Sequence, residues 1–343
     1  MQPNKAIPTE RTHPLRMPKG WEPPVPAWSS TFAEAQAGVS MAVVGFQHPQ
    51  ATSMAEPLQE LHAALEGADV RDLVVSDAGD GLSETVCIAY WRSPRAAGAT
   101  LAAAAFDAFW EKHSAEGLGY GVLKECTNIP FERTETLFSS PVHDHGYSQL
   151  RESTVGPIPH HQYWGGMRDR IPLSAHDALE APGPVRVVAQ SDRHVTVEAH
   201  ENLCIIRSGQ DWSQCDAEQL AEYKDTIEPT LQAGMAFLRD KGSEVNCYAC
   251  RYMKDMALDG SDPKRSCGLA YFRTMKDLED WAEHHPTHLE IFNTFLSIAP
   301  RHGPNLQLRL WHEVSVLPAA DQRADYVNCR PGTGLMGGVS RTT

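Results

Sequence analysis

Two stretches of the chain combine a strand-like apolar run with a longer helical pattern. The first is GVSMAVVGFQ (38–47), followed by EPLQELHAALEG (56–67). The second is RHVTVEAHENLCIIRSG (193–209), followed by AEQLAEYKDTIEPTLQAGMAFLRDKG (217–242). In this last stretch apolar residues recur at helical spacing, which gives the helix one apolar face; they are Leu220, Tyr223, Ile227 and Leu231.

The later part of each half repeats a second pattern. The run ETVCIAYWRSP (84–94) leads into an Ala-rich helical stretch, and RSCGLAYFRTM (265–275) leads into KDLEDWAEHH. Both runs contain Ala-Tyr-aromatic-Arg, with Tyr90 corresponding to Tyr271. This correspondence indicates an internal repeat.

Another strand-like run ends each half, YGVLKECTNI (120–129) and LQLRLWHEVSV (306–316). The order strand, helix, strand, strand, helix, strand is ferredoxin-like. We therefore expect an α+β fold of two tandem ferredoxin-like repeats, packed sheet to sheet with helices outside. The expected divisions are an N-terminal extended segment (1–37), a first repeat (38–138), a connecting segment that carries pocket residues (139–192), a second repeat (193–329) and a loose C-terminal tail (330–343).

Composition and charge exclude several classes of protein. Hydrophobic residues make up 41% of the chain and charged residues 22%, which is typical of a folded globular protein. The net charge of −14 opposes binding to nucleic acid or to an anionic membrane. No apolar run approaches the ~20 residues that a membrane helix needs.

The location of the protein is predicted from its N-terminus, which is rich in proline and lacks the apolar core of a signal peptide. We expect a cytoplasmic protein whose eight cysteines are free. Cys247 and Cys250 form a single C-x-x-C pair, which strand spacing explains more simply than metal binding.

Three histidines lie within five positions in LEDWAEHHPTHLEIFNTFL (278–296). Pro286 suits the first turn of a new helix, and His288 then shares a face with Phe292 and Phe295. His284 is expected to be exposed. A buried imidazole on an apolar face is either a core histidine or the axial ligand of a flat apolar group such as non-covalent haem.

A second inward-facing histidine is predicted in the strand LQLRLWHEVSV. Alternation places His312 on one face with Leu310 and Val314, and Trp311 and Glu313 on the other. The segment HEVSV is not the zinc-protease motif H-E-x-x-H, since its fifth residue is valine. The sequence therefore lacks the main motif that would indicate a metal-dependent peptidase.

Two polar stretches complete the set of candidates. In NLCIIRSGQDW (202–212) an apolar strand runs into Ser208, which is either part of a helix-entry turn or a hydrogen-bond donor at a pocket. In YWGGMRDRIPLS (163–174) the paired glycines predict a tight turn that brings an arginine to a defined place. The alternative for this second stretch is a surface ion pair between Asp169 and a neighbouring arginine.

Together these segments resemble the aldoxime dehydratases, haem enzymes that convert aldoximes to nitriles. The resemblance extends from PPVPAW near the start to YVNCRPGTG near the end, and its most specific segments are YWGGMRDR, IRSGQDW, WAEHHPTHLEIF and LRLWHEVSV. The chain departs from the expected pattern in the loop 299–306, which is longer. It also has Ala27 where related enzymes carry a larger side chain.

The resemblance implies a role for each of five residues. His288 is the proximal haem ligand, and His312 is the distal catalytic histidine. Ser208 hydrogen-bonds the oxime hydroxyl, and Arg170 is the distal arginine. Glu135, in RTETLF, pairs with the distal histidine.

The implied reaction is dehydration of R–CH=N–OH to the nitrile and water. It takes place on ferrous haem b, bound non-covalently in the second repeat, with the oxime nitrogen on the iron and the distal histidine as acid and base. The resemblance also implies a small-molecule partner, the aldoxime, and suggests a homodimer. The alternatives are a haem peroxidase or dismutase-like enzyme, and a non-catalytic haem carrier or gas sensor.

Overall fold

The computed structural model describes residue 8 and residues 10–181 and 183–339. The strands are β1 Ser29–Thr31, β2 Gly38–Pro49, β3 Val70–Gly79, β4 Leu82–Trp91, β5 Gly121–Pro130, β6 Thr134–Phe138, β7 Ser153–Val155, β8 Arg186–Gln190, β9 His194–Glu198, β10 Leu203–Asp211, β11 Cys247–Asp255, β12 Arg265–Phe272, β13 Arg309–Leu317 and β14 Gln322–Val327. The α-helices are α1 Ala55–Ala64, α2 Pro94–Leu101, α3 Ala104–His113, α4 Gly166–Arg170, α5 Ala217–Glu222, α6 Glu228–Lys241, α7 Met275–His284 and α8 Pro286–His302. Short 3₁₀ turns lie at Phe131–Arg133, Gly146–Leu150, Pro172–Ala175, Gly242–Val245, Gly303–Asn305, Ala319–Asp321 and Gly334–Gly338.

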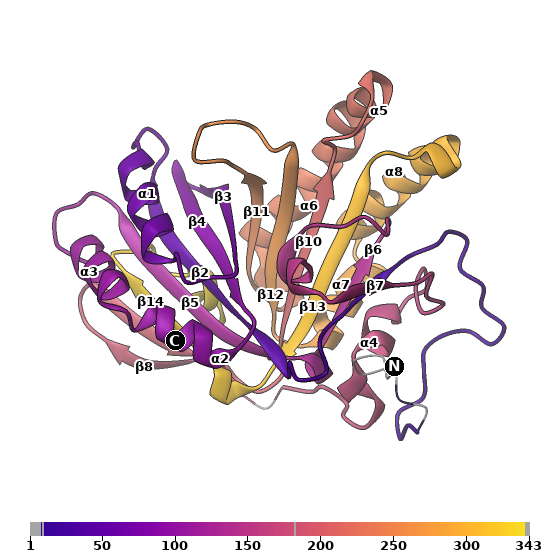
Figure 1. Cartoon of the computed structure of the whole chain (residues 1–343), viewed down its shortest axis with the longest axis horizontal. Coiled ribbons are helices and arrows are strands. Elements are labelled where there is room, and N and C mark those ends of the chain that lie inside the picture. The colour runs from indigo at the N-terminus through magenta and orange to yellow at the C-terminus, as the bar shows by residue number, and fades with distance from the viewer. Residues whose placement is uncertain (1–7, 9, 182, 340–343) are drawn as a thin grey trace.

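Twelve of these strands form one curled antiparallel sheet, so the fold is of the mixed α+β class. Their order is β6-β13-β10-β12-β11-β3-β4-β2-β5-β14-β9-β8. The two halves of the chain pair at three places, where β11 meets β3, β13 meets β6 and β14 meets β5. Figure 1 shows α1 to α3 beside the strands of the first half and α5 to α8 beside those of the second.

Apolar residues fill both sides of the sheet, because alternate side chains point to opposite faces. Inside the curl, residues of both halves share one core, including Val43, Leu123, Ile205, Tyr271 and Leu317. Outside it, α1 to α3 cover the first half, and α6 and α7 cover the second half. The second half therefore has an outer face on which a site can form beneath helices.

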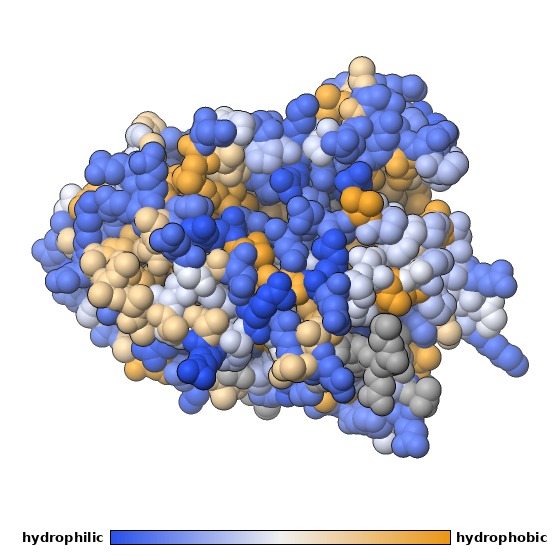
Figure 2. All heavy atoms as spheres, viewed as in Figure 1, coloured by the Kyte–Doolittle hydropathy of each residue, from blue (hydrophilic) through white to orange (hydrophobic). Residues whose placement is uncertain are grey.

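The surface agrees with the charge of the chain. Polar residues predominate on the face drawn in Figure 2, and the apolar ones form separate patches. No helix in the described part of the chain has the length and apolarity needed to cross a membrane.

The elements differ from expectation in three places. The run 193–209 is two strands, because β9 pairs with β14 whereas β10 pairs with β12 and β13. The predicted helix 217–242 is interrupted by a π-helical turn at Tyr223–Ile227. The expectation of a loose tail from residue 330 is wrong for residues 330–339, since Leu335 is buried in the shared core.

A buried ionic cluster fixes the register of β10 and β13 from inside the curl. Arg207 and Glu313 are register partners on these strands. Glu313 accepts hydrogen bonds from the Tyr90 hydroxyl and from the Tyr147 amide, whereas Arg207 donates to Asp72 at 2.8 Å. Burial raises the pKa of Glu313 to about 7, and the nearby Arg207 guanidinium and these two donors lower it only in part.

We expect this carboxyl group to make stability fall as pH rises from about 4.5 to 7. The folded protein binds the proton of Glu313 more tightly than the unfolded chain does, so ionisation at higher pH favours unfolding. The loss amounts to roughly 3 kcal/mol for a single group with this shift. Urea unfolding of Glu313→Gln at pH 5, 6.5 and 8 should lack this decrease. The exposed Glu116→Gln control should retain it, and equal pH slopes in the two variants would contradict the prediction.

Candidate active site

Strands β10 and β13 place a serine and a histidine side by side on the helix-covered face. Ser208 and His312 are register partners, so their side chains lie on the same face with Cβ atoms about 5 Å apart. Val314, two residues after His312, packs in the cluster under α7, whereas Leu310 packs beside Phe295 of α8. His312 therefore lies between two apolar clusters, as alternation along the strand predicts.

Glu135, Arg170 and His312 are in direct contact although they come from distant parts of the chain. Arg170 donates from Nε to Glu135 Oε2 at 2.7 Å and from Nη2 to Oε1 at 3.0 Å. The Nε2 atom of His312 lies 2.9 Å from Glu135 Oε1 and 3.0 Å from Arg170 Nη2. This ring nitrogen has an acceptor and a donor beside it, so it keeps a partner whether or not it carries a proton.

Electrostatics keep Glu135 ionised in this cluster. Burial alone would raise the pKa of Glu135, but the Arg170 guanidinium and the His312 ring outweigh it, and the net shift is downward. In the described part of the chain the other ring nitrogen of His312, Nδ1, has no hydrogen-bond partner, and neither has the Ser208 hydroxyl.

A glycine turn delivers Arg170 to the cluster. Gly165 has φ +94°, and a Cβ there would lie 2.5 Å from Cδ of Arg16. The five-residue helix α4 follows directly, and Arg170 at its end donates from Nη1 to the carbonyl of His160 at 2.6 Å. The expected tight turn that brings a guanidinium to a defined place is confirmed. The surface ion pair of Asp169 is wrong, because Asp169 is 1% exposed and pairs with neither neighbouring arginine.

His288 lies near the start of α8 with one ring nitrogen held and the other free. Pro286 begins the helix, and the Nδ1 atom of His288 donates to the carbonyl of Ala282 at 2.7 Å. Burial lowers the pKa of His288, and this hydrogen bond opposes the shift only in part. Within the described residues its Nε2 atom has no hydrogen-bond partner. This is the usual arrangement of a metal-ligating imidazole.

The surroundings of His288 fit a flat apolar group. Helix α8 has 17 residues, of which only Ile298 is buried, although its sequence is rich in leucine, isoleucine and phenylalanine. Trp164, which is 38% exposed, contacts the rings of His288 and Phe292 at centroid distances of 6.1 and 5.3 Å. An imidazole with a free nitrogen on a half-buried apolar wall meets the needs of non-covalent haem.

A third histidine beside the cluster was not singled out by the sequence. His161 is 1% exposed, and both of its ring nitrogens are buried without a hydrogen-bond partner among the described residues. Burial, with a smaller contribution from Arg170, lowers its pKa to about 4. Because buried polar atoms normally have partners, these nitrogens also suit a pocket that receives a bound group.

The structure thus brings four of the five predicted residues together, Glu135, Arg170 and His312 by contact and Ser208 by register. His288 stands apart from them: its contacts among the described residues are with Ala282 and with two tryptophans. Ser208 lies within β10 and not at its end, which excludes the helix-entry turn.

The C-x-x-C pair belongs to the core. Both cysteines are buried in β11, and no group of three or more possible metal ligands occurs among the described histidine, cysteine, aspartate and glutamate residues. All eight cysteines are free.

Fold and site together define an α+β protein with an acid–base cluster on the helix-covered face of its sheet and, on α8, an imidazole with a free nitrogen. The model of the haem-containing dehydratase family matches residues 42–335. The chain is 35% identical over 335 residues to an aliphatic aldoxime dehydratase of Pseudomonas chlororaphis, covering 95% of this chain and 94% of the relative. It is 34% identical over 332 residues to a phenylacetaldoxime dehydratase of Bacillus sp. (strain OxB-1), covering 93% of each.

The fold gives the same result. A crystal structure of an aldoxime dehydratase in complex with butyraldoxime superimposes with a TM-score of 0.91 at 33% identity, covering 97% of this chain and 95% of that chain. The chain belongs to the family of haem-containing dehydratases. Its cofactor is therefore haem, and its reaction class is that of a lyase.

Proposed function

We propose that the protein dehydrates aldoximes, R–CH=N–OH, to nitriles and water on ferrous haem b. The observation that carries the proposal is the contact of His312 with both Glu135 and Arg170, beside Ser208 and on the face of the sheet that α6 and α7 cover. Relatives at about 35% identity bear the names of aliphatic aldoxime and phenylacetaldoxime dehydratases, which supports the substrate class.

His288 holds the haem through Nε2 in this proposal, with its Nδ1 proton fixed on Ala282. Ferrous haem, when bound, supplies an open coordination position for the oxime nitrogen and electron density for the N–O bond. Hydroxide is a poor leaving group, so the oxime oxygen needs a proton as this bond breaks.

His312 provides that proton and later removes one from the oxime carbon. Glu135 accepts a hydrogen bond from Nε2 of the His312 ring, which leaves Nδ1 to donate to the oxime oxygen. After the transfer the neutral ring accepts the carbon proton, and a histidine near neutral pH is suited to both steps. Ser208 orients the oxime hydroxyl by a hydrogen bond, and Arg170 keeps Glu135 ionised and the ring in place.

Three incubations of the haem-loaded protein test this function and its alternatives. Reduced protein without oxygen should convert butyraldoxime to butyronitrile, and chromatography measures the nitrile formed. The ferric protein should be much slower, and ferric protein with hydrogen peroxide should show no sustained peroxidase turnover. Peroxide turnover without nitrile would favour a peroxidase or dismutase-like enzyme, and binding without any turnover would favour a haem carrier or sensor.

We also propose that the chain consists of two tandem ferredoxin-like repeats, 38–138 and 193–329, with haem in the second. The strand orders β3-β4-β2-β5 and β13-β10-β12-β11 support the repeats. On this proposal an N-terminal extended segment spans residues 1–37, residues 139–192 connect the repeats and supply Arg170, and a C-terminal segment spans residues 330–343. Residues 1–7, 9, 182 and 340–343 of these divisions lie outside the described residues.

Two further proposals concern the setting of the enzyme. A cytoplasmic location is supported by the eight free cysteines, since disulfides are rare in that compartment. A homodimer is suggested by the resemblance alone, and size-exclusion chromatography with light scattering would give the number of chains in the particle.

A further inference from the structure

Three consecutive charged residues of α4 reach in three different directions. Arg170 contacts the acid–base cluster, Arg168 reaches α7, and the Asp169 carboxylate binds the segment 10–28, called here the N-terminal segment. A helix of five residues is far shorter than the ~12–15 residues that make an isolated helix even marginally stable. The position of Arg170 therefore depends on what holds its two neighbours.

The Asp169 carboxylate fastens the N-terminal segment to α4. It accepts from the backbone amide of Arg16 at 3.0 and 2.9 Å, from the amide of Met17 at 3.0 Å and from the Tyr163 hydroxyl at 2.8 Å. A carboxylate is charged, so these bonds are stronger than those between neutral groups. Trp21 extends the attachment by donating from its indole nitrogen to the carbonyl of His161 at 2.9 Å.

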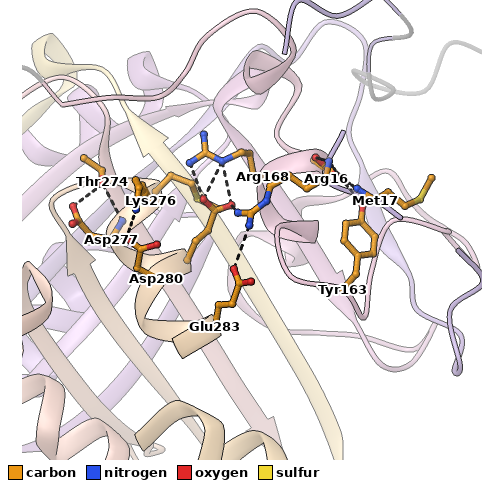
Figure 3. Close-up of polar contacts among 12 residues, drawn as sticks. Arg16, Met17, Tyr163, Arg168, Thr274, Lys276, Asp277, Asp280 and Glu283 are labelled. Atoms are coloured by element: carbon orange, nitrogen blue, oxygen red, sulfur yellow. Dashed lines mark hydrogen bonds and ion pairs between the residues drawn. The ribbon is translucent and has the colours of Figure 1, made fainter. Parts of the chain in front are cut away.

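Two arginines join this assembly to α7, as Figure 3 shows. Arg168 makes a forked contact with Glu279, from Nε at 3.1 and 3.0 Å and from Nη2 at 2.8 Å. Arg16 lies 3.4 Å from Glu279 and 3.2 Å from Glu283. Glu279 is buried, and a buried carboxylate needs such partners to remain charged.

The same stretch of α7 fixes the imidazole on the other side of the site. Ala282, whose carbonyl holds Nδ1 of His288, lies between Glu279 and Glu283. The ion pairs and hydrogen bonds of Arg168 and Asp169 therefore tie α4, the helix that carries Arg170, to the stretch of α7 that holds His288.

We propose that Arg168 and Asp169, with Glu279, form a clamp that sets the position of Arg170 relative to His288. Arg168 and Asp169 are positioning residues, which act through Arg170 and α7 and not on the substrate itself. The inference rests on the proposed function for its catalytic consequence, but the clamp itself is a property of the protein without haem.

The test uses four variants of the full chain: Asp169→Asn, Arg168→Met, Arg168→Lys and the control Asp280→Asn. The asparagine keeps the size of Asp169 but not its charge, and lysine keeps the charge of Arg168 but not its forked geometry. Asp280 forms an exposed ion pair with Lys276 on the same helix. For each variant kcat and KM for butyraldoxime are measured at saturating haem, and the haem-free protein is digested with trypsin, which cuts after Arg16.

The clamp predicts a 10- to 100-fold fall in kcat for Asp169→Asn and Arg168→Met, the range typical of residues that orient a metal site from outside it. KM should change less than about threefold, Arg168→Lys should be intermediate, and Asp280→Asn should match the wild type. Tryptic cleavage in the N-terminal segment should be faster in Asp169→Asn. A lower melting temperature with unchanged kcat would overturn the proposal by showing a purely structural role.

The tryptic arm separates this inference from the proposed function. If the wild type formed no nitrile, the function would be wrong, and the clamp would still be judged by cleavage. Equal cleavage rates in the wild type and Asp169→Asn would contradict it in that case as well.

Discussion

Replacing His288 with alanine should abolish stable haem binding and leave the protein folded. Its Nε2 atom is the free nitrogen of an imidazole whose Nδ1 proton is fixed on Ala282. Loss of a residue that only supports a metal ligand already weakens binding by about 10- to 100-fold, so loss of the ligand itself should exceed ~100-fold. Haem titration followed at the Soret band measures this, and circular dichroism shows whether the fold is kept.

The matched control for this variant is His284→Ala. His284 is exposed on the same stretch of chain, so its removal should leave the haem affinity within about twofold of the wild type. Normal haem binding by His288→Ala would make His288 a core histidine, as the less specific interpretation of the sequence has it.

Replacing His312 with alanine should keep haem and remove turnover. In the proposed reaction His312 gives a proton to the oxime oxygen and takes one from the carbon. Positioned proton transfer contributes about 100- to 10,000-fold to the rate, so kcat should fall by at least about 100-fold. The haem affinity should not change, because His288 and α8 are intact. Initial rates of nitrile formation, normalised to bound haem, give the result.

His176→Ala serves as the control for this second variant. His176 is exposed and lies just after the turn that follows α4, away from the contacts of the cluster. It should retain kcat within about twofold. A kcat within tenfold of the wild type in His312→Ala would remove His312 from the acid–base role.

The spacing of apolar residues along single helices and strands predicted the parts of the site that lie within one element. The apolar face of α8 and the helix start at Pro286 follow from spacing alone, as does the position of His312 on the same strand face as Val314. The choice between a core histidine and a haem ligand did not follow from spacing. That choice needed the resemblance of whole segments to a family.

Contacts between distant segments were beyond the sequence. The resemblance predicted that Glu135 pairs with His312, but nothing in RTETLF itself indicates this contact or the one with Arg170. The contact with His312 depends on the long-range pairing of β6 with β13. A surface ion pair was left open as an alternative for Asp169, because its real partners are backbone amides of the N-terminal segment, which the sequence does not show. Leu335 was assigned to a loose tail because a few apolar residues among glycines show no periodicity.

The most direct test of the central claim is an optical spectrum of the ferrous protein without oxygen, before and after addition of butyraldoxime. The wild type should show a shift of the Soret band together with formation of butyronitrile, and His312→Ala should show the shift without the nitrile. This result would show that the aldoxime binds at the haem and that His312 is needed for the reaction and not for binding. A Soret band that does not respond to butyraldoxime, in protein that carries haem and forms no nitrile, would contradict the account.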